Sequence, residues 1–169
     1  MNTYKAPWGK TLVCISIIFA GMCLGTAVMT YFLAPSIAIL YRIAATGLPL
    51  VLVAGCVPFV IRGYVITGDA ILIRRLFWTT RLERAGLMSA EALPNVMRKS
   101  IRTCGNGGGF SITGWYWSKP LGFYRAFVTD LNRTVVLRFQ RRTVVVSPED
   151  PEEFVRDLAL GDHMQSRSM

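Results

Sequence analysis

The stretch that decides the fold runs from Thr11 to Ile61 and reads TLVCISIIFAGMCLGTAVMTYFLA, then PS, then IAILYRIAATGLPLVLVAGCVPFVI. Residues 11–34 carry no charged side chain, and a helix of this length crosses a hydrocarbon core of roughly 30 Å. Residues 37–61 carry one charge, Arg42. Only Pro-Ser separates the two runs, so we expect two transmembrane helices that fold back on each other as a hairpin.

Positive charges mark both ends of this hairpin. Lys5 and Lys10 precede it, and several arginines follow it, beginning with Arg62. Segments rich in Lys and Arg stay in the cytoplasm, so residues 1–10 are expected as a cytoplasmic tail and residues 62–169 on the same side of the inner membrane. The first apolar run is too long for the core of a signal peptide, and a second run follows at once, so we expect no cleavage.

The chain after the hairpin has the composition of one basic soluble domain. Residues 62–142 carry 14 Lys or Arg and four Asp or Glu, a net charge of +10. Residues 147–169 carry two Lys or Arg and six Asp or Glu, a net charge of −4. A basic domain beside a membrane anchor favours contact with anionic headgroups over nucleic acid. The four cysteines include no CxxC pair, so the sequence supports neither a zinc site nor a disulfide framework, and we expect no cofactor.

The residues after Arg62 follow a β pattern. Runs of Val, Ile and Phe separated by turn residues are expected as strands at 63–67, 70–77, 79–85, 123–129, 134–139 and 142–146. Residues 87–97 fit no single pattern. Alternation along one of these strands places Phe123, Arg125 and Phe127 on the same face.

One helix is expected after the last strand. Asp150 suits the N-cap, Pro151 the first helical position, and Glu153 completes a capping box. In the predicted helix, residues 151–160, an apolar face is formed by Phe154, Val155 and Leu158, and Gly161 can end it. Residues 161–169 are expected as a flexible tail.

This order of strands and one closing helix resembles a pleckstrin-homology (PH) domain. The segments that carry the resemblance are YVIT at 64–67, ILIRR at 71–75, GNGG at 105–108, GFY at 122–124, VTD at 128–130, VVL at 135–137 and VSPEDPEEF at 146–154. The chain is similar to bacterial PH-domain proteins with N-terminal membrane spans. Over residues 62–160, the resemblance implies a mainly-β PH-like barrel with a C-terminal α-helix that plugs one end. Its motifs are turns and a helix cap, without a catalytic signature.

Two stretches of the domain are unusual. The glycines at 105–109 indicate either a tight turn or a nest of backbone N–H groups that could bind an anion, flanked by Arg98, Lys99 and Arg102. Aromatic residues then mix with basic ones around Trp115, Trp117 and Lys119. These rings could lie at headgroup level, stack single-stranded bases or pack into the core; the anchor favours the membrane over nucleic acid.

Small residues are spaced along both predicted membrane helices. Gly21 and Gly25 form a GxxxG pair, and Gly47 and Gly55 lie in the second run. Such residues let helices approach closely. We favour packing between the two helices of the hairpin over packing in a homo-oligomer, which no other feature of the sequence supports.

The sequence therefore predicts a membrane-tethered binding or scaffold module, contacting anionic headgroups or a membrane-protein partner. The alternative is a small accessory subunit that acts through its hairpin. An enzyme is not expected, because the domain has no paired acids with a base and no motif around a nucleophile. The candidate headgroup contacts are Arg74, Arg75, Arg98, Lys99, Arg102, Gly107, Gly108, Trp115, Trp117 and Lys119.

Overall fold

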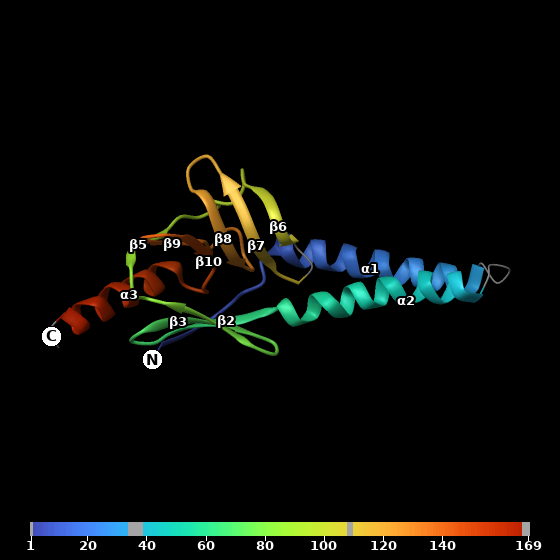
Figure 1. Ribbon diagram of the computed structural model, residues 1–169, viewed down its shortest axis with the longest axis horizontal. Helices are drawn as coiled ribbons and strands as arrows, with labels where there is room; N and C mark the ends of the chain where they lie inside the picture. The colour runs from blue at the N-terminus through green and yellow to red at the C-terminus, as the bar shows by residue number, and fades with distance from the viewer. Residues whose placement is uncertain (1, 34–38, 108–109, 167–169) are drawn as a thin grey trace.

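The computed structural model describes residues 2–33, 39–107 and 110–166, which form a long helical hairpin beside a two-sheet domain with a helix at its far side (Figure 1). In chain order the elements are β1 (Asn2–Lys5), α1 (Lys10–Leu33), α2 (Ile39–Cys56), η1 (Val57–Phe59), β2 (Ile61–Ile66), β3 (Ala70–Arg75), β4 (Thr79–Glu83), β5 (Leu87–Ala92), β6 (Ile101–Gly107), β7 (Ile112–Ser118), β8 (Gly122–Val128), β9 (Val135–Phe139), β10 (Thr143–Val146) and α3 (Pro151–Ser166).

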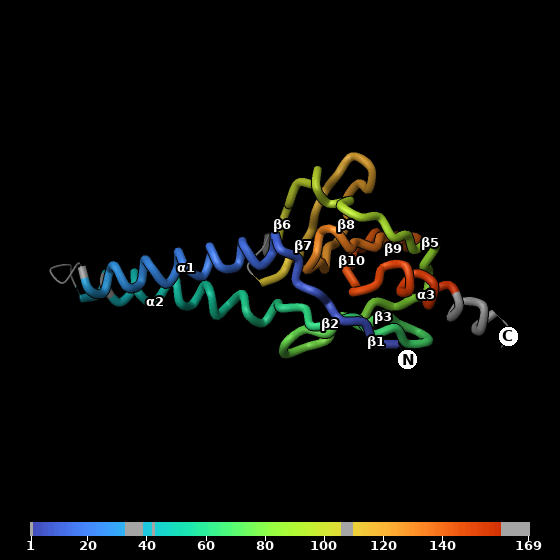
Figure 2. Tube along the Cα trace, turned by 180° about the vertical axis from the view of Figure 1, so that it is seen from behind, coloured from blue at the N-terminus to red at the C-terminus, as the bar shows by residue number. Residues whose placement is uncertain are grey.

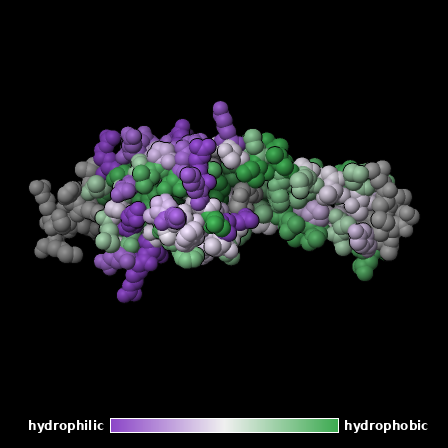
Figure 3. All heavy atoms as spheres, turned by 90° about the horizontal axis from the view of Figure 1, so that it is seen from above, coloured by the Kyte–Doolittle hydropathy of each residue, from purple (hydrophilic) through white to green (hydrophobic). Residues whose placement is uncertain are grey.

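Helices α1 and α2 lie side by side and project away from the domain. Both are long and apolar enough to cross a membrane, over Lys10–Phe32 and Ile39–Phe59. Their large side chains face outward, as Phe32 and Leu40 do at 70% and 77% exposure. Figure 3 shows the contrast between this apolar hairpin and the hydrophilic surface of the domain. The turn predicted at residues 35–36 lies outside the described residues.

The N-terminal segment, expected as a tail, is instead a strand of the domain. Strand β1 pairs antiparallel with β2, with Tyr4 opposite Tyr64, and Figure 2 shows the two side by side. The backbones are in such close contact that a Cβ added at Gly63 would lie 2.6 Å from the carbonyl oxygen of Tyr4. Since β1 precedes the hairpin and β2 follows it, both ends of the hairpin are fixed to one sheet.

The strands form two sheets rather than one continuous barrel wall. One sheet has the order β1-β2-β3-β4, and the other has the order β5-β9-β10-β8-β7-β6. Gly86, with a φ of +83°, turns the chain from β4 of the first sheet into β5 of the second. Within the second sheet, β8 and β10 run parallel, which the sequence did not predict.

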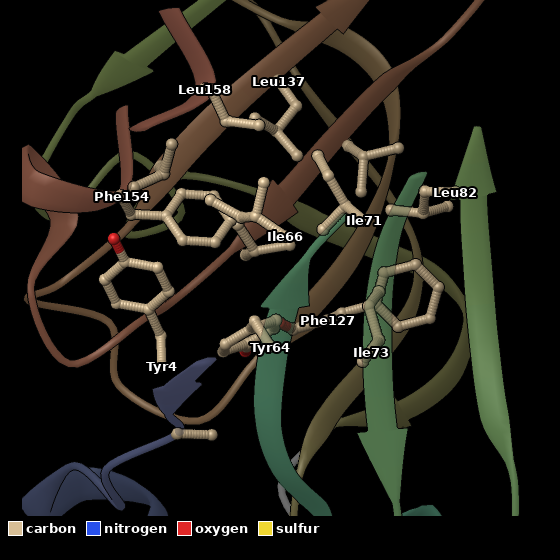
Figure 4. Close-up of a cluster of buried hydrophobic side chains, with 14 of the residues drawn as sticks. Tyr4, Tyr64, Ile66, Ile71, Ile73, Leu82, Phe127, Leu137, Phe154 and Leu158 are labelled. Carbon is tan, nitrogen blue, oxygen red and sulfur yellow. The ribbon is translucent and has the colours of Figure 1, made fainter. Parts of the chain in front are cut away.

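The main core lies between the two sheets and α3 (Figure 4). Phe154 and Leu158 of α3 are fully buried there, as expected from the apolar face of the helix. The ring of Tyr4 packs edge-on against Phe154, with centroids 5.1 Å apart, so β1 contributes to the core as well as to the sheet. Asp150 caps α3 by accepting a hydrogen bond from the Glu153 N–H at 3.0 Å. The helix continues through Gly161 to Ser166, past its predicted end.

A buried hydrogen-bond network joins the two sheets near the hairpin. The Tyr64 hydroxyl donates to the Phe127 carbonyl at 2.7 Å, and the Ser147 N–H donates to the Tyr64 oxygen at 3.2 Å. Burial raises the pKa of Tyr64 to about 12, so this hydroxyl keeps its proton. The Gly9 N–H, one residue before α1, donates to the Thr129 carbonyl at 2.9 Å. The start of the hairpin is therefore held by the second sheet too.

A second apolar cluster covers the outer face of the six-stranded sheet. Tyr116 and Tyr124 stack there with centroids 5.9 Å apart, beside Met97. Leu12, in the first turn of α1, is 1% exposed in this cluster. The hairpin thus packs directly on the domain, and the large sheet has a core on both faces.

Candidate functional site

Aromatic side chains gather where the hairpin meets the domain, a region called here the hairpin base. The turn between β3 and β4, residues 76–78, contacts η1, directly after α2, through Trp78, whose ring lies edge-on to Phe59 at 5.4 Å. Trp8, just before α1, lies 6.4 Å from Phe110. Phe77 at the tip of the turn is 73% exposed. A group of aromatic side chains that includes Trp is typical of the boundary between membrane and water.

Arg75 is buried among these rings. Its side chain is 8% exposed, and its guanidinium carbon lies 5.6, 5.5 and 5.2 Å from the ring centroids of Phe59, Trp78 and Phe127. Its Nε has no hydrogen-bond partner among the described residues. Burial, and secondly the charge of Arg125, hold the pKa of Arg75 below its ordinary value.

The rings compensate this buried charge only in part. Contacts of a cation with aromatic faces contribute about 0.5–2 kcal/mol each. The desolvation of an ion without an opposite charge costs several kcal/mol, and the described residues place no carboxylate within ion-pair distance of Arg75. The surroundings of Arg75 therefore favour the binding of an anion, and the described residues do not supply one.

A second arginine stands against the same ring. The guanidinium carbon of Arg125 lies 4.9 Å from the Phe127 centroid and 5.9 Å from that of Trp115. Arg75 and Arg125 line a hollow of about 290 Å³, called here the inner hollow, together with Phe59 and Trp115. Residues Gly55 and Cys56 at the end of α2 also line it. The inner hollow thus has walls from the domain and from the hairpin.

Paired glycines form the floor of the inner hollow. Gly105 and Gly114 face each other across β6 and β7, with φ of +119° and +146°. A Cβ on Gly105 would lie 2.4 Å from the Thr113 carbonyl oxygen, so both glycines are needed for this close pairing. The predicted glycine turn therefore begins as strand β6, which includes Gly107. Of the anion nest predicted over residues 105–109, residues 108 and 109 lie outside the described residues.

A second, larger hollow of about 410 Å³ lies beside the first, with Arg75 as a shared wall. This outer hollow is lined by Lys5, Arg62 and Arg74 and by the aromatic turn at 76–78, without an acidic residue. Arg62 and Arg74 are exposed and carry no ion pair among the described residues. The hairpin base is therefore basic as well as aromatic.

Acidic side chains gather around α3. Glu149, Asp150, Glu153 and Asp157, from α3 and the segment before it, line a hollow with β1 and the basic Arg133. Thr3 and Tyr4 of β1 line both this hollow and the outer hollow. In Figure 1, α3 lies on the side of the domain away from the hairpin. Asp157 accepts hydrogen bonds from the Tyr4 hydroxyl and the Asn2 amide. These bonds, that of Tyr4 first, lower the pKa of the Asp157 carboxyl.

The Asp157 contact makes the attachment of β1 sensitive to acid. A carboxyl whose pKa is lowered by folding stabilises the fold above its unfolded pKa, and this stabilisation is lost as the pH falls through the folded pKa. We expect the urea concentration at the unfolding midpoint of the full chain to be lower at about pH 3 than at neutral pH. This decrease should be smaller in Asp157→Asn. Identical pH profiles for the two proteins would contradict this coupling.

The other predicted headgroup contacts lie at the opposite end of the β6–β7 hairpin. The near end touches the hairpin base, since the Ser111 hydroxyl donates to the Phe59 carbonyl at 2.9 Å. Ile101 pairs with Trp117 at the far end, roughly 20 Å along the strands from Gly107. The exposed side chains that belong to this far end are Arg98, Lys99, Arg102, Trp117 and Lys119. Of the predicted contacts that the structure describes, only Arg74, Arg75 and Trp115 line the two hollows.

The predicted packing glycines do not lie between the two helices. A Cβ added at Gly21, Gly25, Gly47 or Gly55 would meet no atom of the described chain within 4 Å. The buried positions of α1 are instead Leu12, Ser16, Cys23 and Ala27. Because two residues turn a helix by about 200°, the glycines on either side of Cys23 point away from this stripe. The expected close approach within the hairpin is therefore wrong at these positions.

Sequence reasoning missed Arg125 as a site residue, although its alternation with Phe127 placed both on one face. It also missed the burial of Arg75, which follows Ile71 and Ile73 on the inward face of β3. Among the described residues, no three His, Cys, Asp or Glu side chains form a metal-ligand group.

Comparison with known proteins identifies the domain. A family model described as a bacterial PH domain matches residues 62–160, more than half of the chain. No curated protein and no solved structure matches the chain. The matched region starts at β2 and ends within α3, so it contains the two sheets without β1, and their arrangement with a C-terminal helix fits a PH-like fold. The chain therefore belongs to the bacterial PH-domain family.

Proposed function

We propose that the protein is a membrane-tethered PH-like binding module on the cytoplasmic face of the inner membrane, where it contacts anionic lipid headgroups. The observation that carries this proposal is the polarity of the domain. Basic and aromatic side chains lie at the hairpin base, and acidic side chains lie around α3, which is farther from the hairpin. A negatively charged leaflet attracts the first surface and repels the second.

The attachment of the hairpin supports the orientation. If α1 and α2 cross the bilayer, the pairing of β1 with β2 requires both ends of the hairpin to lie on one side. The Lys and Arg residues at those ends favour the cytoplasmic side. The outer hollow then faces the headgroups, where each Lys or Arg contributes about 1 kcal/mol. Lys5, Arg62 and Arg74 together are enough to orient a domain that is already tethered.

Energy transfer from the native tryptophans to labelled lipids tests the proposal in the full chain. In vesicles, we expect labelled phosphatidylglycerol to gather around the protein more than labelled phosphatidylcholine, and added salt to reduce the difference. The double variant Arg62→Gln/Arg74→Gln should lose most of this enrichment.

The matched control is Arg141→Gln/Arg142→Gln, which removes the same charge from the exposed turn between β9 and β10. This control should keep the enrichment, because the turn lines a separate hollow with Gly86. Equal enrichment of the two lipids around the unmodified protein would contradict the proposal. That result would move the interpretation towards a membrane-protein partner or an accessory subunit.

A further inference from the structure

Arg75 and Arg125 are two cations for which the described chain provides no anion. The side chain of Arg75 is more than nine-tenths buried, lines the inner hollow, and leaves its Nε without a hydrogen bond. Arg125 lines the same hollow and is exposed to it. Their guanidinium carbons lie 5.2 and 4.9 Å from the centroid of one ring, Phe127, so they belong to a single site.

The shape and lining of the inner hollow suit one chemical group. Guanidinium forks bind phosphate oxygens through two parallel hydrogen bonds, and stacking on aromatic faces fixes their planes. Phe59, Trp115 and Phe127 provide such faces. The paired Gly105 and Gly114 add no side chain to the floor, which leaves a space of about 290 Å³.

The position of the inner hollow selects the source of that phosphate. Gly55 and Cys56 line it from the last turn of α2, where a membrane-crossing helix leaves the hydrocarbon. An exposed apolar surface continues from there along α2, including Leu52 and Val51. A phospholipid can place its phosphate between the arginines and its acyl chains along this apolar surface. A soluble phosphate compound has no apolar part that would contact the surface.

We propose that the inner hollow is a headgroup site in which Arg75 and Arg125 bind the phosphate of one anionic phospholipid from the adjoining leaflet. This inference rests on the proposed membrane-tethered function and adds to it a specific, retained lipid. It is separate from the general attraction by Arg62 and Arg74, which line only the outer hollow.

Native mass spectrometry of the full chain in detergent tests the site. The probes are phosphatidylglycerol, phosphatidylethanolamine and soluble glycerol phosphate. We expect one phosphatidylglycerol to be retained in preference to the other two. Arg75→Met and Arg125→Gln should each weaken this retention about tenfold or more, the effect of losing a charged hydrogen bond. Arg141→Gln/Arg142→Gln, in the turn that lines a separate hollow, should leave it unchanged.

Thermal unfolding separates lipid binding from a structural role of Arg75. Without lipid, Arg75→Met should unfold at the same temperature as the unmodified protein or higher, because it removes an unpaired buried charge. Phosphatidylglycerol should raise the unfolding temperature of the unmodified protein but not of Arg75→Met or Arg125→Gln. A less stable Arg75→Met with unchanged retention would overturn the proposal and make Arg75 a structural residue.

Three other results also overturn the site. Retention that persists in Arg125→Gln and Arg75→Met removes these arginines from it. Equal binding of glycerol phosphate keeps the phosphate chemistry but excludes the lipid as its source. No retained phosphatidylglycerol, together with the vesicle enrichment described above, rejects the site while the proposed function stands.

Discussion

Replacing Phe154 by alanine is expected to lower the free energy of unfolding by about 3–5 kcal/mol, the usual cost of emptying a large aromatic position in a core. Phe154 is fully buried between the sheets and lies 5.1 Å from the Tyr4 ring and 6.3 Å from the Tyr64 ring. Its loss therefore affects α3, β1 and β2 together. Urea unfolding of the full chain in detergent, followed by near-ultraviolet circular dichroism, measures the change.

Phe123→Ala is the matched control for this variant. It makes the same substitution at a side chain that is 68% exposed on β8, where a change of about 0.5 kcal/mol or less is expected. Comparable losses in the two variants would mean that α3 does not close the core in the way described.

Gly63→Ala is expected to detach β1, at a cost of up to about 3–5 kcal/mol, the value for removing a large buried aromatic from its site. The added Cβ would lie 2.6 Å from the Tyr4 carbonyl oxygen, a backbone atom that cannot move without the strand. Moving β1 takes Tyr4 out of the core, where its ring is 7% exposed. Hydrogen exchange of the amides in residues 2–5 should rise together with the loss of stability.

Gly68→Ala provides the control for the glycine substitution itself. No atom lies within 4 Å of the Cβ that it adds, in the turn between β2 and β3. Its amide exchange in β1 should match that of the unmodified protein. Protected β1 amides in Gly63→Ala would show that the strand tolerates the displacement, and the importance given to its close pairing would be wrong.

The sequence predicted the elements whose patterns are local. Apolar length and composition indicated α1 and α2, and the Asp150 cap indicated the start of α3. Strands β2 to β4 and β8 to β10 were predicted within two residues at every end, because runs of Val and Ile bounded by turn residues identify them. Membership of the bacterial PH-domain family is confirmed over residues 62–160, whereas the crossing of a membrane stays a prediction.

Elements that depend on distant partners could not be predicted. Strand β1 has four residues, NTYK, without alternation, and exists because β2 offers an edge more than 50 residues later. Strands β6 and β7 contain three glycines, Gly105, Gly107 and Gly114, which favour a loop when considered alone. In the structure, Gly105 and Gly114 instead allow the backbones of β6 and β7 to approach closely. This role depends on the pairing of the two strands and is not visible in either strand alone.

The site was predicted in part, for a physical reason that one residue illustrates. Arg74 and Arg75 look equivalent as neighbouring positive charges, but side chains alternate along a strand. Continuing the inward face of Ile71 and Ile73 puts Arg75 inside and Arg74 outside. The two-residue alternation of side chains along the strand could therefore have distinguished the buried Arg75 from the exposed Arg74. The aromatic contacts with Phe59 and Phe127, which come from other elements, could not have been inferred from spacing.

The pairing of β1 with β2 has a consequence for the synthesis of the protein. Strand β1 leaves the ribosome before the hairpin, yet its partner follows only after the whole hairpin has been made. In the proposed topology, a chain with both helices inserted has returned to its starting side, so the two strands can meet there. A protein with only α1 inserted would leave β1 and β2 on opposite sides of the membrane, with the edge of β2 unpaired. Closure of the first sheet would thus distinguish a chain with both helices inserted from one with only α1 inserted.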